Sequence, residues 1–251
     1  MAQQTGTVTL QGTLGNLTFF KSQDGYMVKI KSAVSKDKIL SDDRFARTRE
    51  NMAEFGNAGA SAKTLRMPFN SVLQQSADNR MISRLLALML KVVQSDTIGT
   101  RGERTAKNGD LSLLEDFDFN NKGILNSTLT CLYDLTYTRV TGNVVFDLPS
   151  FIPTQVIAAP KGTTHYQLQL AGAPVDLDAI KNPAQFILSS ILPWDNANTA
   201  ALNLSLSLPA ASTLPVFVLL QVQFYTKVNA DYYVLNNGAF NACAIVKVDL
   251  P

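Results

Sequence analysis

The residue types most often used for nucleophilic catalysis are few in this chain. His165 is the only histidine, and Cys131 and Cys243 are the only cysteines. A Ser-His-Asp or Cys-His device needs a histidine that a second group orients, and the segment around His165 supplies none. On a strand, His165 would share the polar face of Gln167 and Gln169. We therefore interpret it as a surface residue without a catalytic role.

Metal and phosphate motifs also fail when their spacing is compared with this chain. Residues 116–120 begin like a calcium loop, which needs glycine at its sixth position and glutamate at its twelfth. The chain has Asn121 and Ser127 there. One histidine and two distant cysteines do not form a zinc site, and the glycine pairs lack the Gly-Lys-Ser/Thr ending of a phosphate loop. We expect no enzyme activity, cofactor or metal, and the sequence identifies no small-molecule substrate. An enzyme is the third hypothesis, because it would need carboxylates that the sequence alone does not pair.

Charge divides the chain near residue 110. Residues 1–110 carry sixteen Lys/Arg and ten Asp/Glu, a net charge of +6, and residues 111–251 carry six and ten, a net charge of −4. Opposite charges favour contact between the basic part of one subunit and the acidic part of the next. The basic half also offers candidate nucleic-acid contacts, which are Lys29, Lys31, Lys36, Lys38, Arg44 and Arg47. Interleaved acids weaken that second hypothesis, because they can pair with these residues along a helix.

No secretory or membrane signal is visible in the sequence. Residues 1–20 lack both a basic start and a continuous apolar stretch. The longest fully apolar run, residues 85–90, is far shorter than the ~18 residues that a membrane-spanning helix needs. We expect a cytoplasmic protein without membrane contact, unless a dedicated machine exports it. In a reducing compartment its two cysteines are expected to be buried thiols.

Alternating apolar residues predict a β-hairpin near the N-terminus. Residues 16–21 and 26–31 flank the turn sequence at 22–25, which ends in Asp24-Gly25. A two-stranded hairpin alone is marginal in water, so it must lie on helices, join a later sheet, or add to the sheet of another subunit. For contact with another subunit, the expected hairpin residues are Phe19, Phe20, Tyr26, Val28 and Ile30.

Helical periodicity predicts helices at 41–66 and 78–95. Ser41 or Asp42 is the candidate N-cap of the first helix, and Asp78 caps the second, which has a broad apolar face. Residues 56–62 are mostly Gly and Ala, so another backbone can approach closely there. We expect this close approach to be packing inside one chain. The alternative is a contact between subunits through Phe55, Gly56 and Gly59.

The second half of the chain predicts β-structure. Residues 99–110 form a polar, Gly-rich connection, the candidate boundary between domains 1–110 and 111–251. Many short strands separated by turns predict an antiparallel β-sandwich of the immunoglobulin or fibronectin type. The expected fold class is therefore α+β: an N-terminal β-hairpin and helices, then the sandwich. The expected strands are roughly 124–138, 142–148, 164–172, 184–192, 200–208, 215–227, 231–236 and 239–249.

Short stretches spread over nearly the whole chain carry a family resemblance. They are LGNLTFFK with DGY at 14–26, RTREN with EFG at 47–56, DNRMISR at 78–84, PSFIP at 149–153, APKGTTH at 159–165, LPWD at 192–195 and NGAFN at 237–241. In these stretches the chain resembles a family of uncharacterised proteins abundant in Bacteroidetes bacteria. The resemblance implies a bacterial protein with this two-part layout. It implies neither a reaction nor catalytic residues.

These patterns favour a structural protein that associates with itself into a homo-oligomer or filament. The hairpin without an obvious local sheet, the small-residue helix segment and the opposite charges of the two halves support this prediction. The alternative is a binding module, for nucleic acid through the basic half or for a protein or carbohydrate through the sandwich loops. Trp194, the only tryptophan, is expected to plug one end of the sandwich, or alternatively to stack on a ligand.

Overall fold

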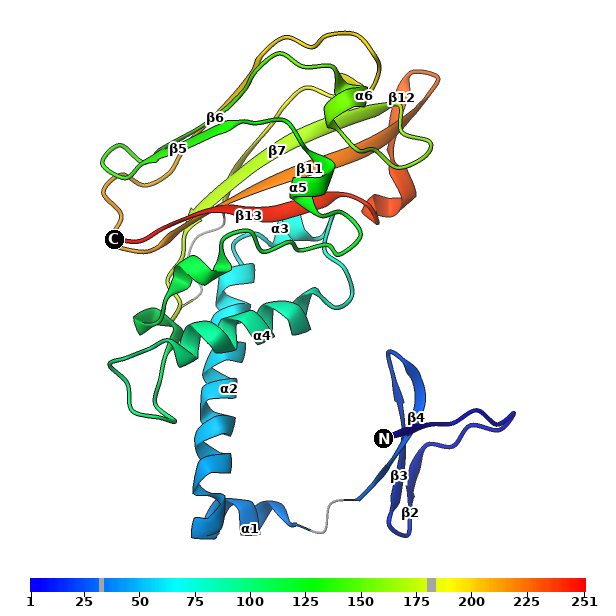
Figure 1. Ribbon diagram of the computed structural model, residues 1–251, viewed down its shortest axis with the longest axis vertical. Coiled ribbons are helices and arrows are strands. Elements are labelled where there is room, and N and C mark those ends of the chain that lie inside the picture. The colour runs from blue at the N-terminus through cyan, green and yellow to red at the C-terminus, as the bar shows by residue number, and fades with distance from the viewer. Residues whose placement is uncertain (32–33, 180–183) are drawn as a thin grey trace. The chain divides into compact units, whose positions relative to one another are not determined.

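The computed structural model describes residues 1–31, 34–179 and 184–251. It is a mixed α+β structure whose sheets are antiparallel, as the sequence predicts (Figure 1). The chain divides into two compact units, Met1–Asn51 and Met52–Pro251. This division differs from the boundary predicted near residue 110, because helices of residues 52–110 share a hydrophobic core with the later strands.

The first unit contains a four-stranded antiparallel sheet with the strand order β1-β4-β3-β2. The predicted hairpin is confirmed as β3 (Leu17–Ser22) and β4 (Gly25–Ile30). Two outer strands that the sequence did not predict, β1 (Ala2–Gln3) and β2 (Gly12–Leu14), extend it. They were missed because two or three residues are too few to show alternation.

Helices follow the sheet. The predicted helix 41–66 is divided into α1 (Lys36–Ser41), a 3-10 turn (Asp43–Phe45) and α2 (Ala46–Arg66). Asp42 does cap a helical turn, but its carboxylate accepts from the backbone N–H of Arg44 in the 3-10 turn, not from α2. The short α3 (Asn70–Leu73) leads to α4 (Met81–Gln94), which confirms the helix predicted at 78–95.

The second unit contains two antiparallel sheets. The larger is built around the long strand β11 (Val216–Val228) and its partner β7 (His165–Pro174). The remaining members of the larger sheet are β8 (Gln185–Leu188), β9 (Leu192–Pro193), β12 (Asp231–Val234) and β13 (Ala242–Asp249). The smaller sheet has the order β10-β6-β5, and its members are β5 (Asp134–Thr138), β6 (Asn143–Leu148) and β10 (Leu202–Ser207).

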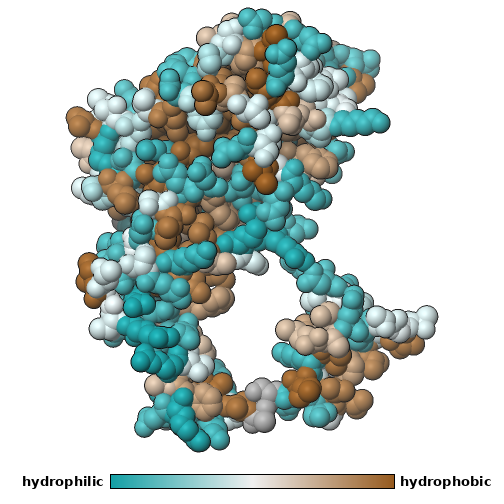
Figure 2. All heavy atoms as spheres, viewed as in Figure 1, coloured by the Kyte–Doolittle hydropathy of each residue, from teal (hydrophilic) through white to brown (hydrophobic). Residues whose placement is uncertain are grey.

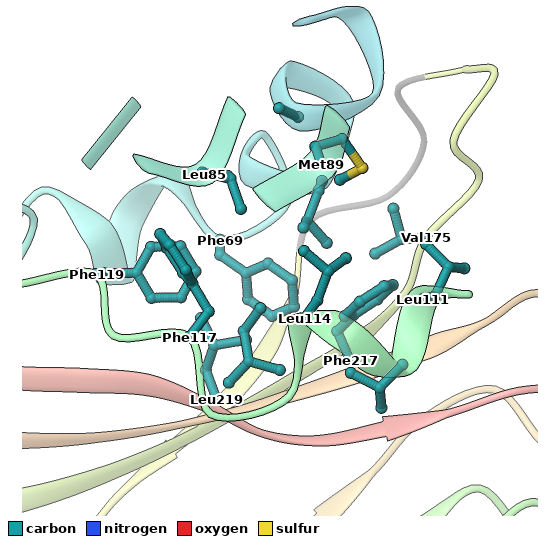
Figure 3. Packing of buried hydrophobic residues seen from close by; sticks show 14 of the residues in the cluster. Phe69, Leu85, Met89, Leu111, Leu114, Phe117, Phe119, Val175, Phe217 and Leu219 are labelled. Carbon is teal, nitrogen blue, oxygen red and sulfur yellow. The ribbon is translucent and has the colours of Figure 1, made fainter. Parts of the chain in front are cut away.

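Two hydrophobic cores lie on opposite faces of the larger sheet. Alternate residues of β11 point to opposite sides, so Phe217 and Leu219 enter the core beneath α2, α3 and α4 (Figure 3). Val218 and Leu220 enter the core shared with the smaller sheet. Because both faces of β11 are buried, its sequence is a nearly continuous apolar run.

The helix-facing side of β11 becomes polar toward α3. Gln221 donates from Nε2 to the carbonyl of Val72 (3.2 Å), and Gln223 donates to the side chain of Gln75 (2.6 Å) and to that of Gln169 (3.0 Å). The side chains of Gln169, Gln221 and Gln223 are buried, and a buried amide is stable only when it is hydrogen-bonded. The glutamine network therefore fixes the α3 segment on the sheet.

The detail of the second half departs from the sequence prediction. The structure shows antiparallel sheets but not an immunoglobulin-type sandwich, because helices cover one face of the larger sheet and β10 lies beside β8, curling the strands into a half-barrel. The strand predicted at 124–138 is shorter than expected, since α5 (Leu125–Thr128) occupies its first part. Another short helix, α6 (Pro153–Val156), connects β6 to β7.

Gly56 gives a test of the helical assignment of residues 56–62. It is exposed in the interior of α2, and an added Cβ would meet no atom within 4 Å. Gly56→Ala should therefore stabilise the protein by about 1 kcal/mol, the helix-propensity difference, as measured by urea unfolding. Gly109→Ala is the control, because its Cβ would overlap the carbonyl oxygen of Val92. Destabilisation by Gly56→Ala would contradict an exposed helical Gly56.

The two cysteines should differ in reactivity. Both are free thiols, and Cys243 is fully buried whereas Cys131 is half-buried. Burial raises the pKa of the Cys243 thiol to about 12, and burial also raises the pKa of Cys131. Because the thiolate is the reactive form, iodoacetamide at pH 8 should label Cys131 first and Cys243 only after unfolding. Equal labelling rates in the folded protein, measured by mass spectrometry, would contradict the buried position of Cys243.

Candidate assembly surface on the N-terminal sheet

The register of the N-terminal sheet collects apolar side chains on one face. Phe19 pairs with Val28, and Leu17 with Ile30, and residues two apart on a strand share a face. Leu14 joins them through its pairing with Leu17. We call this surface the apolar sheet face; it consists of Leu14, Leu17, Phe19, Tyr26, Val28 and Ile30.

The apolar sheet face is not buried. No residue in the described part of Met1–Asn51 is buried, and the Leu14 and Ile30 side chains are 71% and 74% exposed. Figure 2 shows hydrophobic residues at the surface of this sheet. A sheet that is apolar on one face is stable when a second layer covers that face. The uncovered face is therefore the main candidate for a contact surface.

Four of the five hairpin residues predicted for assembly lie on this face, and one does not. Phe20 is on the opposite side of β3, where the Lys29 ammonium lies 5.5 Å from the centre of its ring. The prediction grouped Phe20 with Phe19, whereas the alternation of a strand places neighbouring residues on opposite faces. Lys21 is the charged strand residue on the apolar face, and its ammonium lies 5.6 Å from the centre of the Tyr26 ring.

The small-residue segment of α2 packs within its own chain on one side. Ala58 and Ala62 are buried in the core that also contains Leu85 of α4. The opposite side stays exposed: Phe55 is 54% exposed, and Gly56 has open space above its Cα. The predicted third member, Gly59, lies beside Leu86 of the same chain, at 3.9 Å from a Cβ built on the glycine.

The six predicted nucleic-acid contacts are exposed but lie on separate elements. Lys29 belongs to β4 and Lys31 follows it, Lys36 and Lys38 belong to α1, and Arg44 and Arg47 surround the start of α2. Two of them are paired with acids. Arg44 forms an ion pair with Asp42 (2.7 Å), and Arg47 forms one with Glu50 (3.0 Å). This pairing reduces the charge that those two arginines offer to a phosphate backbone.

His165 and Trp194, the remaining candidates for a functional role, both make structural contacts. His165 is partly buried against the ring of Tyr232, with centroids 4.9 Å apart. Burial is the first cause that lowers its pKa, and the charge of Lys227 is the second. Trp194 donates from its indole N–H to the carbonyl of Ile157 (3.1 Å) and packs against the core between the two sheets. These contacts support the interpretation of Trp194 as a plug.

The surface of the second unit also has hollows, of which two are candidates for binding. A groove of about 510 Å³ at one end of the smaller sheet, the acidic groove, is lined by Leu132, Tyr133, Asp134, Asp147, Leu148, Pro149, Ala201, Leu202 and Asn203. A cleft of about 460 Å³, the amide cleft, lies between the α3–α4 connection and two loops. Its amide side chains are Gln74, Gln75, Asn79, Asn120, Asn121, Asn236 and Asn237.

Comparisons with known proteins return no assignment. No family model, curated protein or solved structure matches the chain. Within the described residues, no group of three or more His, Cys, Asp or Glu side chains is arranged to hold a metal ion. No described helix is long and apolar enough to cross a membrane.

The burial pattern predicts that the second unit folds without the N-terminal sheet. Deleting residues 1–31 removes no buried residue, so at a protein concentration below that of any self-association the truncated chain should keep the same urea midpoint for its cooperative unfolding. The full-length chain is the reference, and circular dichroism follows the transition. A clearly lower midpoint in the truncated protein would mean that the sheet stabilises the second unit.

Proposed function

We propose that this protein is a structural subunit that associates with itself into a homo-oligomer or filament, in a bacterial assembly. The observation that carries the proposal is the apolar sheet face, which gathers six apolar side chains of the first unit without burying any of them. The proposed role needs no catalytic residue. We also propose that the chain belongs with the Bacteroidetes family that it resembles.

The physical basis is the free energy of covering apolar surface. Burial of apolar area contributes about 25 cal/mol per Å², and a small isolated sheet gains little of it. With strands about 4.8 Å apart and a rise of about 3.3 Å per residue, the three strands of the face measure roughly 15 by 20 Å. A standard interface buries about 800 Å² per partner. The area that this face alone can bury is therefore small. Self-association of the protein through it should depend on protein concentration.

A binding module is the second candidate, and the amide cleft is the observation that favours it. Amide groups both donate and accept hydrogen bonds, as recognition of sugar hydroxyls requires. Asn120 and Asn241 hold the walls together: Asn120 donates to the carbonyls of Ala239 (3.0 Å) and Asn241 (2.8 Å), and Asn241 donates to that of Gln75 (2.9 Å). The cleft suits a carbohydrate better than the dispersed basic residues suit a nucleic acid.

Substitution of the apolar sheet face tests the leading proposal. Ile30→Asp places a charge at a side chain that is 74% exposed, so it should leave the sheet folded. It should lower the mass of the particle measured by light scattering and weaken association at least about tenfold, which corresponds to ~1.4 kcal/mol.

The matched control is Thr18→Asp, which adds the same charge to the opposite face of the same sheet, across from Lys29. It should assemble like the unsubstituted protein. A single-chain mass for the unsubstituted protein at every concentration, or equal assembly of Ile30→Asp, would contradict the proposed function.

A further inference from the structure

The acidic groove contains two carboxylates that face each other across a strand pair. Asp134 of β5 is directly opposite Asp147 of β6 in the antiparallel register. Like charges in this arrangement are destabilising. The side-chain amide of Asn203 donates a hydrogen bond to the Asp147 carboxylate (2.6 Å). Because an amide is neutral, this bond does not compensate the negative charge. In the part of the chain that the structure describes, neither carboxylate forms an ion pair. The groove therefore has the electrostatics of a site for a cationic side chain.

The walls of the acidic groove are apolar. Leu148, Pro149 and Leu202 line it together with Tyr133. Leu132, at the entrance to β5, is 90% exposed. The strand β5 is also the last in the sheet order β10-β6-β5, so one of its edges has no neighbouring strand among the described residues. A groove that combines apolar walls with two carboxylates, beside an open strand edge, is a surface on which another sheet can dock.

The apolar sheet face has the complementary chemistry. It offers apolar side chains for the groove walls and one cation, Lys21, for the two carboxylates. The exposed side of α2 is a poorer docking site for this face, because Arg49 lies near its start and its like charge disfavours a docked lysine. Pairing of two identical apolar sheet faces would likewise bring two copies of Lys21 into one interface without a carboxylate from either face.

We propose that the apolar sheet face of one copy docks in the acidic groove of a second copy, with Lys21 between Asp134 and Asp147. This inference rests on the proposed function and names the partner surface. The two surfaces are different, so each copy offers one of each. Such a head-to-tail contact produces a ring if its rotation closes and an open filament if it does not.

A mixing experiment tests this pairing. Ile30→Asp disables the apolar sheet face, and Asp134→Lys with Asp147→Lys disables the acidic groove. Each variant alone should lose assembly by light scattering. Mixed in equal amounts they should form a particle of two chains, because the first variant keeps an intact groove and the second keeps an intact face. Association of the mixture that is no stronger than that of either variant alone would overturn the proposal.

Reversal of the charges gives a second, independent readout. Lys21→Asp should weaken association several-fold, and the same substitution combined with Asp134→Lys and Asp147→Lys should restore it. The control is Asp178→Lys with Asp231→Lys, which changes the net charge equally at exposed carboxylates outside the groove and should assemble normally. If the lysine variants do not fold by circular dichroism, Asp134→Asn with Asp147→Asn replaces them and should weaken assembly.

The outcomes separate this inference from the proposed function. If the unsubstituted protein has a single-chain mass at all concentrations, both fail. If Ile30→Asp disrupts assembly and the folded groove variants assemble like the unsubstituted protein, the docking site is wrong while self-assembly stands. If Asp178→Lys with Asp231→Lys disrupts assembly as strongly as the groove variants do, overall charge and not the groove explains the effect, and the proposal is overturned.

Discussion

The second unit depends on the burial of β11 on both of its faces. The alternation of side chains along a strand sends Phe217 and Leu219 to one core and Val218 and Leu220 to the other. Each core needs a cover, which the helices supply on one side and the smaller sheet on the other. The polar end of the same strand obeys the same constraint, since its buried glutamines find partners in the α3 segment. The curled arrangement of the sheets follows from covering one central strand pair twice.

Side chains also alternate between the two faces of the sheet in the first unit, but there the described apolar residues stay unburied. Its register also sorts apolar residues onto one face, but no described residue there is buried. The contrast between the two units is the physical reason for proposing that the first unit mediates assembly. Where the chain supplies its own second layer, alternation produces a core. Where it supplies none, alternation produces a surface that water covers at a cost in free energy.

Local periodicity accounts for what the sequence could predict. The hairpin β3–β4 and the helix α4 have repeats of two and 3.6 residues over enough positions to be recognised. The strands β1 and β2 are too short for that, and α5 lies in an apolar segment that resembles a strand. The helical cover of the larger sheet was missed because it depends on contacts between distant segments, which no local pattern records.

The sequence likewise predicted only part of the candidate site. The apolar residues of the hairpin were recognisable, but assigning Phe20 to the opposite face required the distinction between neighbours on a strand. The sequence indicated opposite charges in the two halves without locating them. The juxtaposition of Asp134 and Asp147 depends on the register between β5 and β6, and those residues are thirteen positions apart. A composition argument identifies the sign of the charge, whereas only the pairing of strands locates it.

The position of the N-terminal sheet in the chain also affects how the protein is made. The last of its four strands ends at Ile30, so this sheet emerges from the ribosome long before the strands that line the acidic groove. At roughly 5–20 residues per second, the 177 residues from Ile30 to Ser207, the end of β10, take about 9–35 s to synthesise. Throughout that time the nascent chain carries an exposed apolar face. Neighbouring ribosomes on one messenger RNA hold several such faces close together, and uncovered apolar surface at high local concentration is prone to non-specific contact before folding is complete.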